Sequence, residues 1–421
     1  MTTPSARPIR MSLLLLAYFA FISLGLPDGL LGVAWPSIAG DFKVATEAVG
    51  LLLIASTTGY FISSVAAGFT IARVGVGWLL AFSTAAASAA LAGYAISPAY
   101  AVMVPFALLA GFGGGAIDSG LNAYAAAAFG AKHMNWLHAF FGLGVAIGPL
   151  IMTAVISGGL SWRWGYGIVA SAQAGLALAF FVTVRRWVRH GEVGPPPPEV
   201  SVPVGDAVAT AVAVKPATKV RTRETLAIPA VWLGVLAFAV YVAVEAGAGL
   251  WAFLLLTEAR GVSAAVAGVC VSLYWGMLFV GRVVQGVASE RVNPTKILVG
   301  SLFGMAAGAL LVALPLPAWV TVCGLAVIGF AAAPVFPLLT LTTAERVGPA
   351  HADRAIGMQI GAAGLGGSLI PSGIGILMGR YGAGVLGTCL LVLSVLLIVF
   401  YGAATSARAR AASRPGVASA G

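Results

Sequence analysis

Charged residues are scarce in this sequence. Asp, Glu, Lys and Arg make up 9% of the 421 residues, hydrophobic residues make up 60%, and the mean hydropathy is +1.00. A soluble domain carries about 25% charged residues, and one with so few would expose apolar patches and aggregate. The composition therefore excludes an ordinary soluble protein and indicates that lipid surrounds most of the chain.

Signatures of catalysis and of cofactor binding are also missing. The sequence has no G-x-x-x-x-G-K-[ST] phosphate-binding loop, its four histidines lack metal-ligand spacing, and its three cysteines form no C-x-x-C pair. We expect Cys270, Cys323 and Cys389 to be small buried side chains. We expect no enzyme activity, metal or cofactor.

Long apolar stretches are abundant. A membrane-spanning helix needs about 20 apolar residues, and the 55 glycines suit close helix packing in lipid. The sequence predicts an all-α membrane protein with twelve spans. They are expected near 12–36, 48–72, 77–97, 101–128, 137–158, 165–185, 229–257, 264–289, 296–314, 318–343, 355–379 and 383–404.

The net charge of +10 follows the predicted loops. If both termini are cytoplasmic, 18 of the 23 Lys and Arg residues lie in cytoplasmic segments, and outer loops hold only Lys43, Arg163, Arg260 and Arg380. This is the positive-inside bias, so no nucleic-acid partner is needed to explain the charge. We expect a multi-pass protein of the bacterial inner (plasma) membrane. It is expected to bind a small-molecule solute and to work as a monomer in the lipid bilayer.

A basic, proline-rich segment at 186–228 divides the spans into six and six. It predicts an N-terminal bundle (1–185), a cytoplasmic linker, a C-terminal bundle (229–404) and a disordered cytoplasmic tail (405–421). The halves resemble repeats offset by about 218 residues. Asp28 falls opposite Glu245, Gly111 opposite Gly329, and Pro149 near Pro371.

This organisation resembles the major facilitator superfamily, which implies two six-helix bundles with pseudo-symmetry. The loop signature of that family is G-x-L-A-D-R-x-G. Gly68, Arg73 and Gly75 match it, whereas Ala72 replaces its acid. The second repeat has Gly286, Glu290 and Arg291 at the matching positions, so we interpret both segments as a cytoplasmic gating motif.

Three acids lie inside predicted spans: Asp28, Asp118 and Glu245. Each would cost roughly 2.5–3.5 kcal/mol if charged and unpartnered at the bilayer centre. They are therefore expected to face the bundle interior, as protonation sites. The alternative for Asp118 is a polar lock between helices, and for Asp28 a position near the outer surface.

Further polar side chains are candidate solute ligands. Asn122 shares a helix face with Asp118, and Gly111, Gly114 and Gly115 on that helix are expected to leave space for a ligand. Proline is expected to bend span 1 at Pro27 and to break spans 10 and 11 at Pro334 and Pro371. The other candidate ligands are His138, Tyr241, Glu245, Trp275 and Gln359, each with packing as the alternative. Arg282 is expected to reach the gating loop, with direct solute contact as the alternative.

The pattern Asp118-x-x-x-Asn122 followed by Asn135-x-x-His138 resembles the fucose permease branch of the superfamily and its sodium-dependent glucose-transporter-like relatives. The resemblance implies that Asp118 binds solute and carries a proton. His138 replaces a Gln of fucose permease and Phe141 a polar residue, so the solute differs from L-fucose. We expect proton-coupled symport of a sugar or related hydroxylated solute, with Na⁺ as the alternative coupling ion and drug or metabolite efflux as the alternative function.

Overall fold

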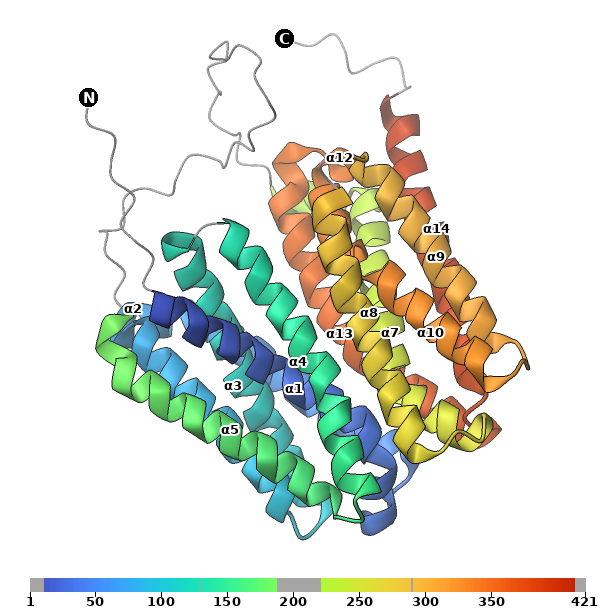
Figure 1. The fold of residues 1–421 in the computed structure, drawn as a ribbon. Helices are drawn as coiled ribbons and strands as arrows, with labels where there is room; N and C mark the ends of the chain where they lie inside the picture. The colour runs from blue at the N-terminus through green and yellow to red at the C-terminus, as the bar shows by residue number, and fades with distance from the viewer. Residues whose placement is uncertain (1–10, 130, 188–220, 289–290, 413–421) are drawn as a thin grey trace.

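The computed structural model describes residues 11–129, 131–187, 221–288 and 291–412. Long helices dominate this part of the chain (Figure 1). The first half holds α1 (Met11–Phe42), α2 (Val49–Ile96), α3 (Tyr100–Ala128), α4 (Ala131–Ser157) and α5 (Trp162–Thr183). The second half holds α7 (Pro229–Leu254), α8 (Ala264–Ala288), α9 (Pro294–Ala313), α10 (Ala318–Ala332), α11 (Val335–Leu341), α13 (Pro349–Tyr381) and α14 (Val385–Ala412).

Short elements connect these helices. They are the 3₁₀ turns η1 (Thr46–Ala48) and η2 (Val184–Arg186), the π-helical turn η3 (Leu255–Ala259), and the helices α6 (Thr222–Leu226) and α12 (Thr343–Val347). Most of the predicted linker lies outside the described residues, and α6 falls at its end. α14 continues to Ala412, into the segment that was predicted to be a disordered tail.

The twelve predicted spans are present. Eleven helical segments in the described residues are long and apolar enough to cross a membrane. One of them, Thr46–Ile96, has 51 residues, far more than the roughly 20 that one crossing needs. Gly75 interrupts it with φ 81° and ψ 163°, a backbone conformation that is essentially restricted to glycine. α2 is therefore two spans joined at Gly75.

The expectations about proline were only partly correct. Span 10 is broken as predicted, because α10 ends at Ala332 and α11 begins at Val335, on either side of Pro334. In contrast, α1 continues through Pro27 and α13 continues through Pro371. Neighbouring helices can re-satisfy the backbone groups that a proline frees inside a membrane, so these two helices are not broken.

The repeat is visible in the packing. Gly111 of α3 lies against the carbonyl of Ser56 in α2, and Gly329 of α10 lies against the carbonyl of Tyr274 in α8. Both members of the second pair lie 218 residues after those of the first, which is the offset found in the sequence. The two halves therefore use the same close helix contact.

We call the end of the bundle where α1 begins and α14 ends the terminal end, and the opposite end the far end (Figure 1). The halves meet where α4 packs on α8, α2 on α13, and α1 on α7. Several glycines lie in this interface without room for a Cβ atom. Gly32 faces the carbonyl of Leu250, Gly268 faces Thr153, and Gly364 faces the ring of Phe61.

The far end of this interface is closed by η1. The indole of Trp35 donates to the carbonyl of Thr46 (2.8 Å), and the hydroxyl of Tyr100 donates to the carbonyl of Ala48. These bonds hold η1 against α13, where Gly375 and Gly379 lie next to Glu47. An element of the first half thus covers the second half at this end.

Candidate functional site

Asp118 of α3 is held by side chains from two helices. The hydroxyl of Tyr60 in α2 donates to Oδ2 (2.6 Å), and Nδ2 of Asn122, one turn along α3, donates to Oδ1 (2.8 Å). Both carboxylate oxygens thus accept a hydrogen bond. Hydrogen bonds to both oxygens offset part of the cost of placing a carboxyl group in the membrane interior.

The glycines before Asp118 pack helices together, which corrects one expectation. Gly111 and Gly115 leave no room for a Cβ atom because the backbone carbonyls of Ser56 and Tyr60 lie against them. Gly114 has a single neighbour, the side chain of Leu24 at 3.3 Å. Close contact between α2 and α3 is what brings Tyr60 to Asp118.

His138 of α4 lies between charges from both halves. Its exposed ring is within electrostatic range of Asp118 in the first half and of Arg282 in the second. Nη1 of Arg282 lies 3.4 Å from the carbonyl oxygen of His138. Arg282 therefore points across the interface at α4; its predicted reach to Glu290 falls on a residue outside the described part of the chain.

Glu245 of α7 forms the corresponding acidic group of the second half. Tyr241, one turn earlier, donates its hydroxyl to Oε2 of Glu245 and also lies 3.1 Å from the carbonyl oxygen of Ala332. Tyr274 of α8 donates to the backbone carbonyl of Glu245 (2.8 Å). Arg282 is within electrostatic range of both tyrosines, so Glu245 and Arg282 belong to one polar group.

Asp28 of α1 keeps accessible surface although protein atoms surround it, and it lies within electrostatic range of Tyr60. It therefore belongs to the group around Asp118. The next residue, Gly29, lies against Pro149 and the carbonyl of Val145 in α4. We call Asp28, Tyr60, Asp118, Asn122, His138, Tyr241, Glu245, Tyr274 and Arg282 the central polar cluster.

Two predicted solute ligands take no part in the hydrogen bonds of this cluster. Gln359 is fully buried, accepts a hydrogen bond from Thr343 (3.0 Å) and packs against Gly234. Trp275 lies with its ring against Gly249, and its indole nitrogen has no hydrogen-bond partner in the described residues. Nε2 of Gln359 also lacks a hydrogen-bond partner in the described residues, so solute binding and packing both stay predictions for these two residues.

The predicted gating residues lie at the terminal end. Gly68 and Arg73 are exposed on α2, and Gly75 makes the turn between its two spans. Gly286 and Arg291 are exposed near the end of α8. Glu290 lies outside the described residues, so the acid of the second motif is not placed.

Tyr60 and Tyr274 were missed in the sequence. Each lies in an apolar span, where tyrosine is also an ordinary packing residue. A weak signal was present for Tyr60, which lies four residues before Ser64 and follows Gly59 in a stretch of small residues. The described residues contain no group of three or more His, Cys, Asp or Glu that could hold a metal ion.

Comparisons with known proteins extend these observations. Residues 17–371 match the sequence model of the Major Facilitator Superfamily. No significant match was found among curated proteins.

Solved structures share the fold. A bacterial homologue of the human lysosomal transporter Spinster, inward-facing and occupied, has a TM-score of 0.75 at 14% identity and covers 98% of this chain and 100% of its own. The D-xylose–proton symporter has a TM-score of 0.71 at 14% identity, covering 93% and 98%. FucP in the outward conformation has a TM-score of 0.59 at 16% identity, covering 94% and 98%.

Proposed function

The chain belongs to the Major Facilitator Superfamily and is a membrane transporter, not an enzyme; from this premise we propose that it carries out proton-coupled symport of a small hydroxylated solute. The proposed solute is a sugar or a related compound, and the protein works as a monomer in the bilayer. The observation that carries the proposal is the pair of hydrogen bonds from Tyr60 and Asn122 to Asp118.

Proton coupling follows from the chemistry of Asp118. As a carboxylate it accepts both bonds, and its charge is costly in the membrane interior. Protonation removes that charge and converts one oxygen into a donor. The site would then present a different set of donors and acceptors to a solute, so proton and solute occupancy influence each other.

A hydroxylated solute suits the groups on both sides of the interface. Asp118, Asn122 and His138 come from the first half, whereas Glu245 comes from the second. Carboxylate, amide and imidazole groups offer both donors and acceptors to hydroxyls. A solute that contacts both halves binds differently when the halves move, which is the requirement for alternating access.

The proposal is tested with purified protein in proteoliposomes under an inward proton gradient. Accumulation of radiolabelled D-xylose and sorbitol is measured for the wild type and for Asp118→Asn, which keeps the size of the side chain and removes its titration. We expect the variant to lose gradient-driven accumulation. The matched control is Asp353→Asn, because Asp353 is exposed at the start of α13.

Accumulation by Asp118→Asn at the wild-type level would reject proton coupling through this residue. Replacing the proton gradient with a sodium gradient in the same vesicles tests Na⁺ as the coupling ion.

Efflux of apolar compounds is the second candidate function. The ring of Phe21 makes an edge contact with His138 at a centroid distance of 5.5 Å, so an aromatic wall adjoins the polar cluster. Expressing cells would then resist lipophilic cations, and this resistance would be lost in Glu245→Gln. Unchanged sensitivity of the expressing cells argues against efflux.

We further propose that the terminal end faces the cytoplasm of a bacterium. The support is the distribution of Lys and Arg in the sequence, with 18 of 23 in the segments predicted to be cytoplasmic and only Lys43, Arg163, Arg260 and Arg380 in the predicted outer loops. A reporter that is active only outside the cytoplasm should be silent when fused after Gly421 and active when inserted at Gly159.

A further inference from the structure

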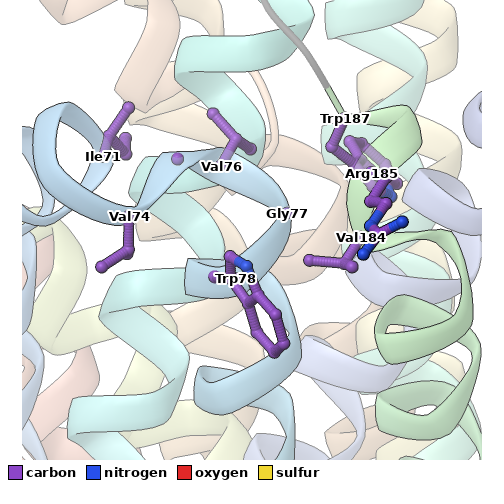
Figure 2. A pocket seen from close by; sticks show the side chains of 9 residues that line it. Ile71, Val74, Val76, Gly77, Trp78, Val184, Arg185 and Trp187 are labelled. Atoms are coloured by element: carbon purple, nitrogen blue, oxygen red, sulfur yellow. The ribbon is translucent and has the colours of Figure 1, made fainter.

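A pocket of about 330 Å³ lies at the terminal end of the first half (Figure 2). It is formed between the break in α2 and the end of α5. None of its side chains belongs to the central polar cluster, so the proposed transport mechanism does not account for it. Its lining consists of Ile71, Val74, Gly75, Val76, Gly77, Trp78, Val184, Arg185 and Trp187.

The shape of the pocket follows from two glycines. Gly75 turns the chain with its positive φ, and Gly77 lies directly against the backbone of Val184. The second span of α2 therefore starts in contact with the end of α5. Trp187, at the end of the lining formed by the α5 side, is buried, and its indole nitrogen donates to the hydroxyl of Thr183 (3.2 Å).

The lining of the pocket is mainly apolar, and arginines lie at its edge and near it. Arg185 lines it, and both Arg186 and Arg73 are exposed at the same end of the helices. In Figure 2, Arg185 and Trp187 lie on one side of the pocket and Ile71 and Val74 on the other. The mouth therefore combines positive charge with apolar walls.

An apolar path leads from the pocket toward the middle of the membrane. Trp78 stacks on Phe82 at a centroid distance of 5.4 Å, and both rings contact Phe181 of α5 at 6.0 and 5.5 Å. Trp78 is 42% exposed and Phe82 is 60% exposed. These rings form a strip on the outer surface of the bundle, where acyl chains would lie.

We propose that this pocket binds an anionic phospholipid, with the headgroup phosphate at Arg185 and one acyl chain along Trp78 and Phe82. Charge complementarity selects the occupant, since arginine pairs well with phosphate and basic pockets near the membrane surface bind anionic headgroups. Tryptophan is also enriched at the depth of the headgroups. The bound lipid would fill the angle between α2 and α5.

The test is native mass spectrometry of the purified full-length protein with phosphatidylglycerol and phosphatidylcholine of identical acyl chains. We expect preferential retention of phosphatidylglycerol. Arg185→Gln should weaken its binding about fivefold, the effect of one arginine near an anionic surface. Arg185→Lys should retain most of the preference, and the matched control Arg380→Gln, exposed at the far end, should leave it unchanged.

Equal retention of the two lipids by the wild type would overturn the proposal. So would wild-type binding by Arg185→Gln, whose exposed side chain can be replaced without risk to folding. Displacement of the lipid by equimolar glycerol 3-phosphate would also overturn it, because the pocket would then recognise a soluble phosphate ester.

Discussion

Tyr60 and Asn122 bind the two oxygens of Asp118 from different directions, one across a helix contact and one along the same helix. Asn122 moves with Asp118, whereas Tyr60 belongs to another span. A small displacement of α2 relative to α3 would therefore change one bond and leave the other. At the residue scale, a movement of α2 would therefore change the hydrogen bonding of Asp118 through Tyr60.

Tyr60→Phe tests this role. The change removes only the hydroxyl, and a hydrogen bond to a charged group contributes about 1.5–3 kcal/mol. We expect the apparent affinity for the transported solute to fall at least about tenfold, measured as concentration-dependent uptake in proteoliposomes. Tyr381→Phe, with an exposed ring at the far end, should behave like the wild type, and an unchanged Tyr60→Phe would contradict the role.

The sequence predicted individual site residues where a charged side chain would carry a high free-energy cost in lipid. Asp118, Asp28 and Glu245 stand out because a carboxylate in an apolar span needs an explanation, and all three lie in the central polar cluster. Gln359 stands out for the same reason, yet it bonds to Thr343 and not to that cluster. A polar side chain signals that a partner exists, and only the tertiary structure identifies the partner.

Among the elements, α2 has the most unusual construction. It has 48 residues and crosses twice, with a single glycine making the turn. The two spans were predictable because each reaches the length that lipid requires. The break expected at Pro371 is absent because neighbouring helices compensate for proline, an effect that depends on packing and cannot be seen in one span.

Gly75→Ala should destabilise the protein. A residue with a Cβ atom at φ 81° and ψ 163° costs on the order of 1–3 kcal/mol. We expect a lower midpoint of thermal unfolding in detergent. Gly300→Ala in α9, where a Cβ would meet no atom within 4 Å, should be neutral or slightly stabilising because alanine favours a helix. Equal midpoints of thermal unfolding for the two variants would contradict this prediction, because a Cβ atom at position 75 would then cause no strain.

For the whole molecule, the important feature is how the two halves meet. η1 covers α13 at the far end, and α4 and α8 remain in contact from Thr153 with Gly268 to His138 with Arg282. The repeat predicted that two similar halves would face each other. It could not predict which end is closed, because both ends are compatible with the same internal packing.

Distances between spin labels should therefore change in opposite directions on transport. One pair is placed at Lys43 and Arg380 at the far end, and one at Ala72 and Asp353 at the terminal end, all exposed positions, in a variant without its three cysteines. With saturating solute at low pH, we expect the far-end distance to increase and the terminal-end distance to decrease in double electron–electron resonance. Two unchanged pairs, or two that change together, would contradict alternating access.

The glycines of the interface have a genetic consequence. At Gly32, Gly268 and Gly364 the opposite half occupies the place where a side chain would begin. Every single-nucleotide missense change of a glycine codon introduces at least one carbon atom there. Alleles that abolish transport should thus accumulate at these three codons as readily as at Asp118, although none of the three glycines belongs to the central polar cluster.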